Sequence, residues 1–234
     1  MKDLILVDFD DTLVDTGPRF QNARRSLLAL MREAGFAEDV AYDMLYNQVD
    51  PGMRTKYGLG PRRMEPSFVE TYQRLCDTHG IALDREVMER CAELGRGVYG
   101  PPPAFEGALD ALRRLSAELP TIVYTQSGDM QYQLECVRGA GIIDIVREDR
   151  VHVCDRKDAE MFLQTLTRYG VADPGGAWMV GNSMRSDINP ALEAGANAIL
   201  VETSDPWEYD LVDPVADHFH RVPTFPHAVD LLLS

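Results

Sequence analysis

Short apolar runs of strand length alternate with helical segments along much of the chain. Helical patterns separate the later runs, and several of these patterns end in glycine, a common residue at a helix C-terminus. The runs are LILVDF (4–9), TIVYT (121–125), AWMVG (177–181) and NAILV (197–201). Strands and helices in alternation form parallel sheets that carry helices on both faces. The sequence therefore predicts an α/β fold with a doubly wound, mainly parallel sheet.

Residues 17–100 have a different character, because they show helical periodicity and no convincing strand. Pro66 suits the first turn of a helix, and Asp84 suits an N-cap position. Proline and glycine are frequent at both borders of this segment, as in linkers between domains. We therefore predict an all-helical domain at 17–100, inserted after the first strand of an α/β core that is formed by 1–16 and 101–234.

The charge of the chain is strongly acidic. It has 38 acidic and 23 basic residues among 234, which gives a formal net charge of −15. The excess lies outside residues 17–100, where twelve basic residues balance twelve acidic ones. Such a charge argues against non-specific binding to nucleic acid or to anionic membrane surfaces. It is compatible with a small anionic substrate, because a metal ion or a few cations can reverse the field in one pocket.

Cysteine spacing and hydropathy indicate a reducing, aqueous compartment. The cysteines form no CxxC pair and are far apart, so we expect free thiols. They are Cys76, Cys91, Cys136 and Cys154. No stretch approaches ~18 apolar residues, and LILV is too short for the core of a signal peptide. We expect a soluble cytoplasmic protein without membrane or nucleic-acid partners, either a monomer or a small homo-oligomer.

Aspartates crowd the end of the first predicted strand, where Asp8 ends the apolar run and Asp10 follows it. Residues i and i+2 of an extended chain point to the same side and lie roughly 6.6 Å apart. Ligands of open α/β sheets bind at the carboxyl ends of the strands. Two carboxylates there can share a hard cation or divide the roles of acid and nucleophile. A solvated acidic turn is the other interpretation of the same residues.

Three later segments favour the chemical interpretation. IVYTQSG, the lysine of CDRKDAEMF and VGNSMRSD follow in this order, each at or after a predicted strand end. Together with VDFDDT they resemble the four motifs of the haloacid dehalogenase-like hydrolase superfamily. The matching positions are Asp8, Asp10 and Thr12 for the first motif, Thr125 for the second, Lys157 for the third and Asp187 for the fourth. Asn182 stands where this family more often has an aspartate.

The resemblance implies a Mg²⁺-dependent phosphatase that works through an aspartyl-phosphate. Asp8 would be the nucleophile and a metal ligand, while Asp10 would be the general acid and base and would give its backbone carbonyl to the metal. Asp187 would complete the protein ligands of the metal. Thr125 and Lys157 would contact the phosphoryl group of a small phosphorylated metabolite.

Two further features bear on the branch of the family. Dehalogenases of this family lack an aspartate two residues after the nucleophile, so Asp10 indicates phosphoryl transfer. The helical insertion resembles the cap domain of the family, which would carry much of the substrate specificity. Its stretch 47–66 contains Arg54, Lys56, Arg62 and Arg63 among glycines and prolines, as in a loop. These cations either meet a second anionic group of the substrate or are simply solvated.

Two other functions remain open at this stage. A phosphomutase acting on a sugar phosphate would use the same residues and keep water away from the phospho-enzyme. A catalytically weak metal-binding or interaction protein on the same scaffold is the alternative to an enzyme, because Asn182 removes one carboxylate from the fourth motif. Sugar phosphates, nucleoside monophosphates, flavin mononucleotide and phosphoglycolate are all substrates in this class, and the motifs do not select among them.

Overall fold

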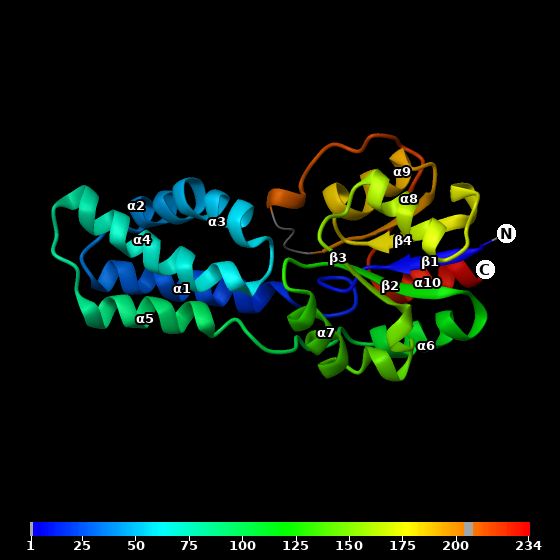
Figure 1. Cartoon of the computed structure of the whole chain (residues 1–234), viewed down its shortest axis with the longest axis horizontal. Helices are drawn as coiled ribbons and strands as arrows, with labels where there is room; N and C mark the ends of the chain where they lie inside the picture. The colour runs from blue at the N-terminus through cyan, green and yellow to red at the C-terminus, as the bar shows by residue number, and fades with distance from the viewer. Residues whose placement is uncertain (1, 204–207) are drawn as a thin grey trace. The chain divides into compact units, whose positions relative to one another are not determined.

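The computed structural model of the chain describes residues 2–203 and 208–234. The chain divides into two compact units. One unit is formed by Met1–Thr16 with Pro101–Ser234, and the other is Gly17–Gly100. The first unit contains the sheet, and the second is helical (Figure 1).

A parallel sheet of six described strands forms the centre of the first unit. In spatial order the strands are β3 (Val151–Cys154), β2 (Thr121–Gln126), β1 (Leu4–Val7), β4 (Ala177–Gly181), β5 (Asn197–Val201) and β6 (His220–Val222). This is the strand order of Rossmann-like folds, in which the direction of winding reverses beside β1. The predicted doubly wound α/β fold is therefore confirmed.

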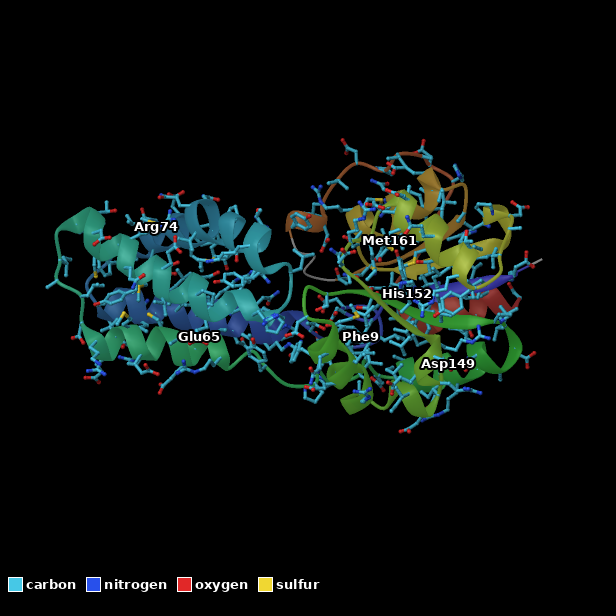
Figure 2. The ribbon with its side chains drawn as sticks, in the orientation of Figure 1. Phe9, Glu65, Arg74, Asp149, His152 and Met161 are labelled. Carbon is cyan, nitrogen blue, oxygen red and sulfur yellow. The ribbon has the colours of Figure 1, made fainter. Side chains whose placement is uncertain are left out.

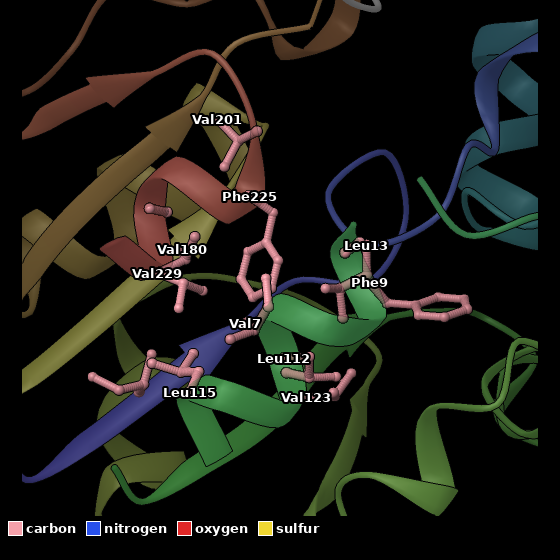
Figure 3. Close-up of a cluster of buried hydrophobic side chains, with 14 of the residues drawn as sticks. Val7, Phe9, Leu13, Leu112, Leu115, Val123, Val180, Val201, Phe225 and Val229 are labelled. Atoms are coloured by element: carbon pink, nitrogen blue, oxygen red, sulfur yellow. The ribbon is translucent and has the colours of Figure 1, made fainter. Parts of the chain in front are cut away.

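Helices cover both faces of this sheet because its inner strands are apolar on both sides. The helices of this unit are α6 (Ala108–Glu118), α7 (Met130–Gly139), α8 (Ala159–Arg168), α9 (Asn189–Glu193) and α10 (Phe225–Leu233). Ile5 and Val7 pack with residues of α6, α7 and α10, as Figure 3 shows for Val7 among Leu112, Leu115 and Phe225. Leu4 and Leu6 point to the other face and pack with α8 and α9. Met161 of α8, labelled in Figure 2, packs against this second cluster.

The sequence predicts four of these strands and misses β3 and β6. Both lie at the edges of the sheet and are short. The residues of β3 are mostly half-buried, and two of the three residues of β6 are exposed. Neither strand therefore forms the continuous apolar run that marks a buried strand. β1 also ends earlier than LILVDF predicts, because the chain turns back after Asp8 and the carbonyl of Phe9 accepts hydrogen bonds from Leu13 and Val14.

The second unit consists of helices around a core of its own. Its elements are α1 (Gly17–Glu33), α2 (Glu38–Asp43), η1 (Met44–Val49), α3 (Asp50–Tyr57), η2 (Pro61–Arg63), α4 (Met64–His79) and α5 (Arg85–Arg96). Leu27, Phe68 and Leu75 are fully buried in this core. The sequence predicts a loop over most of 47–66, and this prediction is wrong, because η1, α3 and η2 occupy most of that stretch. Pro51 stands in the first turn of α3, where a helix tolerates it.

The four cysteines are free and buried, as expected. Among the described residues, no helix has both the length and the apolar character that a membrane span requires.

Gly95 tests the packing of the helical unit, because α5 approaches α4 closely at this residue. A Cβ atom on Gly95 would lie 2.3 Å from the Cα atom of Glu65, which is labelled in Figure 2. In an open helix, Gly→Ala stabilises by roughly 1 kcal/mol. Here we expect Gly95→Ala to lower the free energy of unfolding by about 1–3 kcal/mol, measured from urea midpoints. Gly97→Ala is the control, because its Cβ would meet no atom closer than 3.4 Å. Equal midpoints for the two variants would contradict the close approach.

Candidate active site

Asp8 lies at the carboxyl end of β1, at the point where the winding of the sheet reverses. Its backbone N–H donates to the carbonyl of Val180 in β4 at 2.9 Å, which holds Asp8 in line with the neighbouring strand. Its side chain is buried. Crevices at such reversal points are the usual ligand sites of doubly wound sheets.

Lys157 joins Asp8 to Asp187. It arrives in the loop between β3 and α8, and its Nζ donates to Asp8 Oδ1 at 2.5 Å and to Asp187 Oδ1 at 2.7 Å. The Lys157 side chain is 3% exposed, and its Nζ lies 5.3 Å from the centre of the Tyr124 ring. The structure therefore brings three residues predicted from separate motifs into one buried ionic group.

The charges of this group do not cancel. Burial raises the pKa of Asp8 well above its ordinary value, and the nearby Asp187 raises it further, although Lys157 acts in the opposite direction. Burial opposes the charge of Lys157, but Asp187 and Asp8 outweigh burial and raise its pKa. Lys157 therefore stays charged at neutral pH, and two carboxylates share one ammonium group. A bound cation would offset the remaining negative charge.

Asp10 belongs to a second bonded group, with Thr125. Thr16 Oγ1 donates to Asp10 Oδ1 at 2.7 Å, and Gln133 Nε2 donates to Asp10 Oδ2 at 2.5 Å. The same Gln133 nitrogen donates to Thr125 Oγ1 at 2.9 Å. Because the Thr125 oxygen accepts this bond, its hydroxyl proton is left for another acceptor. Gln133 thus fixes the carboxylate of Asp10 beside the hydroxyl of Thr125.

The position of Asp187 depends on a glycine and a serine of the fourth motif. A Cβ atom on Gly181 would lie 2.3 Å from Asp187 Oδ2, so only glycine leaves room for the carboxylate. The backbone N–H of Ser183 donates to the same Oδ2 at 2.9 Å. Since Lys157 holds Oδ1, both oxygens of Asp187 have a protein donor.

Asn182 lies between the two bonded groups. One atom of its amide is 3.2 Å from Asp8 Oδ2 and 3.2 Å from the carbonyl oxygen of Asp10. Both neighbours are acceptors, so the amide nitrogen faces them and donates to both. A half-turn of the amide would bring its oxygen to the same place. Three oxygen donors would then converge there, from Asp8, Asp10 and Asn182.

This arrangement fits Mg²⁺. Mg²⁺ is commonly bound through one or two carboxylates and keeps several of its waters. Within the described part of the chain, no group of three His, Cys, Asp or Glu side chains gathers for a metal. The donors available here are the Asp8 carboxylate, the Asp10 carbonyl, the Asn182 amide and the nearby Asp187, which suit a hard cation with a partly hydrated shell.

Four residues of the site are not predicted from the sequence. They are Thr16, Gln133, Ser183 and Asp210. Ser183 Oγ donates to Asp210 Oδ1 at 2.6 Å, and burial raises the pKa of Asp210. Ser183 lies within the fourth motif, so the motif could have pointed to it. No sequence signal points to Gln133 or Asp210, because the local pattern does not predict that a polar residue on a helix will lie close to the end of a distant strand.

Comparison with known proteins indicates the family to which this chain belongs. The family model described as haloacid dehalogenase-like hydrolase matches residues 2–195. No curated protein matches the chain significantly. The chain is similar in structure to a haloacid dehalogenase-like family hydrolase from Xanthomonas campestris, with a TM-score of 0.78 and 22% identity over 98% of this chain and 91% of that one.

Two other solved structures show the same fold with different named activities. A 2-haloacid dehalogenase from Pseudomonas syringae has a TM-score of 0.59 and 19% identity, over 100% of this chain and 99% of that one. A HAD phosphatase from Thermococcus onnurineus has a TM-score of 0.58 and 19% identity, over 98% of this chain and 97% of that one. Because the family model spans most of the chain, this protein belongs to the haloacid dehalogenase-like hydrolases.

Proposed function

We propose that this hydrolase is a Mg²⁺-dependent phosphatase of a small phosphorylated metabolite, working through an aspartyl-phosphate on Asp8. The observation that carries the proposal is the fixed carboxylate of Asp10, which Thr16 and Gln133 hold beside Thr125. We further propose that the sheet-containing unit is the catalytic core and that Gly17–Gly100 is a cap domain.

In the first step an oxygen of Asp8 attacks phosphorus while the ester P–O bond breaks. Asp10 gives a proton to the departing oxygen, so that an alcohol leaves. Thr125 donates its hydroxyl proton to a phosphoryl oxygen, and Lys157 neutralises part of the negative charge. When bound, Mg²⁺ would offset the repulsion between the carboxylates and the substrate dianion.

In the second step Asp10 takes a proton from water, and the water oxygen attacks the phosphorus of the aspartyl-phosphate. The bond between Asp8 and phosphorus breaks, which releases inorganic phosphate and restores both carboxyl groups. Asp10 thus acts once as an acid and once as a base, which requires that it stay in one place. The donors Thr16 and Gln133 supply that restraint.

The carboxylate of Asp10 also favours phosphatase over dehalogenase chemistry. A halide leaves as a stable anion and needs no proton, whereas an alkoxide leaving group does. A residue that is fixed by two donors and faces the phosphoryl-binding threonine has no evident purpose in dehalogenation. Incubation with a sugar phosphate separates phosphatase from phosphomutase: free phosphate supports the proposal, and an isomeric sugar phosphate contradicts it.

Asp8→Asn tests the nucleophile. A neutral amide can occupy the end of β1 but cannot attack phosphorus, so phosphate release should fall by more than about 10³-fold. The measurement is phosphate release from a panel of phosphorylated metabolites with Mg²⁺, on protein whose fold is checked by circular dichroism. Asp15→Asn is the control, because it removes a carboxylate from the same loop without touching the bonded groups. Substantial turnover by folded Asp8→Asn protein would exclude the aspartyl-phosphate.

The fourth motif tests the metal. EDTA should abolish phosphate release and added Mg²⁺ should restore it. Ca²⁺ should substitute poorly, because it tends to hold both oxygens of a carboxylate.

We expect Asp187→Asn to weaken apparent Mg²⁺ binding and turnover strongly, since it also removes an anionic partner of Lys157. Asn182→Ala should cost less, about 0.5–1.5 kcal/mol, because it removes one neutral group. Asn182→Asp should tighten apparent Mg²⁺ binding by adding a charge.

These variants are compared by the Mg²⁺ dependence of phosphate release beside the parent enzyme. If Asn182→Ala is as damaging as Asp187→Asn, the metal is organised around the amide. The ligand role proposed for Asp187 would then be wrong.

Gln133→Met tests the restraint on Asp10. The variant keeps the volume of the side chain and removes both hydrogen bonds, so Asp10 and Thr125 lose their common donor. Displacement of a catalytic group by about 1 Å costs on the order of 10²-fold in rate, and we expect a loss of about 10- to 100-fold in kcat. Gln131→Met, an exposed change on the same helix α7, should retain parent activity. Equal activity of the two variants would mean that Asp10 needs no such restraint.

A further inference from the structure

Ser183 fixes the turn that carries Asp187. It is the N-cap of η6 (Met184–Ile188), and its carbonyl accepts hydrogen bonds from the backbone N–H groups of Asp187 and Ile188 at 2.9 and 3.1 Å. Its side-chain oxygen accepts from the backbone N–H of Ser186 at 3.0 Å. Its own N–H donates to Asp187 Oδ2. The direction of the Asp187 carboxylate therefore depends on where Ser183 lies.

Asp210 in turn holds Ser183. The Ser183 hydroxyl has one proton, which it donates to Asp210 Oδ1 at 2.6 Å. A hydrogen bond to a carboxylate is roughly twice as strong as one between neutral groups. Ser183 is 6% exposed, so loss of this acceptor would leave a buried donor without its partner, which is unfavourable. The bond thus links a residue outside the four motifs to the turn of the fourth motif.

Asp210 belongs to a segment that is bonded to the fourth motif and to the helix after it. It ends η7 (Glu208–Asp210), which lies between β5 and β6 in the chain. Arg185 Nε donates to the carbonyl of Tyr209 at 2.6 Å, and the guanidinium lies over the Tyr209 ring. The amide of Asn189 forms two further hydrogen bonds, with the backbone of residues 213 and 215. The segment therefore has a fixed register against the turn that carries Asp187.

Two charged residues of the active site act on Asp210. Burial raises the pKa of Asp210 and the bond from Ser183 lowers it, while Asp187 raises this pKa and Lys157 lowers it. Asp210 therefore lies within electrostatic reach of the site. A neutral acceptor could tie the segment to Ser183 at a lower cost in desolvation. A carboxylate in this position is consistent with a role at the site.

We propose that Asp210 is a positioning residue of the metal site, which acts on Asp187 through Ser183. It keeps the Ser183 N–H on Asp187 Oδ2, so that Oδ1 stays beside Lys157 and available to a cation. Groups that orient metal ligands from outside commonly account for about 10- to 100-fold in metal affinity. This inference rests on the proposed Mg²⁺ site and adds to it a residue that no motif contains.

The first experiment measures Mg²⁺ binding to the whole protein by isothermal titration calorimetry. Asp210→Ala and Ser183→Ala should each weaken the Mg²⁺ Kd about tenfold, because both remove the same hydrogen bond. Asp210→Asn should weaken it less than about threefold, since the amide oxygen can still accept from Ser183. Asp213→Asn is the matched control and should keep the parent Kd. It removes an exposed carboxylate from the same segment and leaves the carbonyl that is bonded to Asn189.

These variants separate the geometry of Asp187 from the charge of Asp210. Ser183→Ala changes no charge, so its effect on the Kd reports geometry. If Asp210→Asn weakens the Kd as much as Asp210→Ala, or if Asp210→Ala binds Mg²⁺ like Asp213→Asn, the positioning role is wrong. Asp210→Ala keeps the bond from Ser186 that caps η6, so it decides the outcome alone if Ser183→Ala does not fold.

A double variant tests whether Ser183 and Asp210 act through one bond. The combined loss of Mg²⁺ affinity in Ser183→Ala/Asp210→Ala should be smaller than the product of the two separate fold-changes. A loss equal to that product would mean that the two residues act independently, which contradicts the proposal.

Asn189→Ala separates positioning from a general loosening of the segment. It removes both bonds to residues 213 and 215 and leaves the bond between Ser183 and Asp210 in place. It should lower the urea midpoint while the Mg²⁺ Kd stays within about threefold of the parent value, because it removes no group that orients Asp187. An equal loss of Mg²⁺ affinity in Asn189→Ala and Asp210→Ala would mean that Asp210 has no role of its own.

The same titrations keep this inference apart from the proposed function. If Asp187→Asn weakens the Mg²⁺ Kd and Asp210→Ala does not, the metal site stands and the positioning role falls. If the parent protein binds no Mg²⁺, both fall. If the variants weaken Mg²⁺ binding as expected but the parent releases no phosphate from any substrate, only the phosphatase proposal falls.

Turnover gives a last test of the positioning role. For Asp210→Ala, the Mg²⁺ concentration at half-maximal phosphate release should rise about tenfold, as the Kd does. The loss in rate should shrink as Mg²⁺ is raised, because mass action refills a weakened metal site. A loss in rate that is the same at every Mg²⁺ concentration would overturn the inference.

Discussion

The ammonium group of Lys157 makes the carboxylate cluster at the sheet edge possible. Asp8 and Asp187 are buried side chains of two different segments, and Lys157 reaches both from a third. Removal of one partner from a buried ion pair typically costs about 3–5 kcal/mol, because it leaves a charge uncompensated. The group therefore fixes the loops after β1, β3 and β4 relative to one another. The parallel strand order matters because it brings the C-terminal ends of β1, β3 and β4 to the same end of the sheet.

The same group is less stable than it could be, which is consistent with a catalytic role. The raised pKa of Asp8 means that its surroundings disfavour the charged form which a nucleophile needs. A protein built only for stability would place an amide or an apolar side chain there. Sites that act on ligands commonly keep such unfavourable groups and depend on the rest of the fold for stability. Asn182 limits this cost, since an aspartate in its place would add more negative charge beside Asp8.

Sequence patterns predict the interior of this fold better than its edges. The runs of β1 and β4 are apolar on both sides because helices cover both faces, whereas β3 and β6 are half-exposed edge strands without such a run. Asp8 and Asp187 could be found because each follows a predicted strand within a recognisable motif, and Lys157 because it precedes a helical pattern in the third motif. Gln133 and Asp210 could not, because their contacts depend on how α7 and the segment after β5 pack against distant residues. From the sequence, Arg54 and Arg63 resemble solvated loop cations, whereas in the structure both form ion pairs with the buried Asp50.

The sheet-containing unit leaves negative charge unbalanced in a buried place. One lysine there serves two carboxylates, those of Asp8 and Asp187. This imbalance lowers the stability of the folded protein, and a cation that binds to the folded state alone would restore that stability. The acidic net charge of the chain is compatible with an anionic ligand at the same place, because a bound cation would reverse the local field.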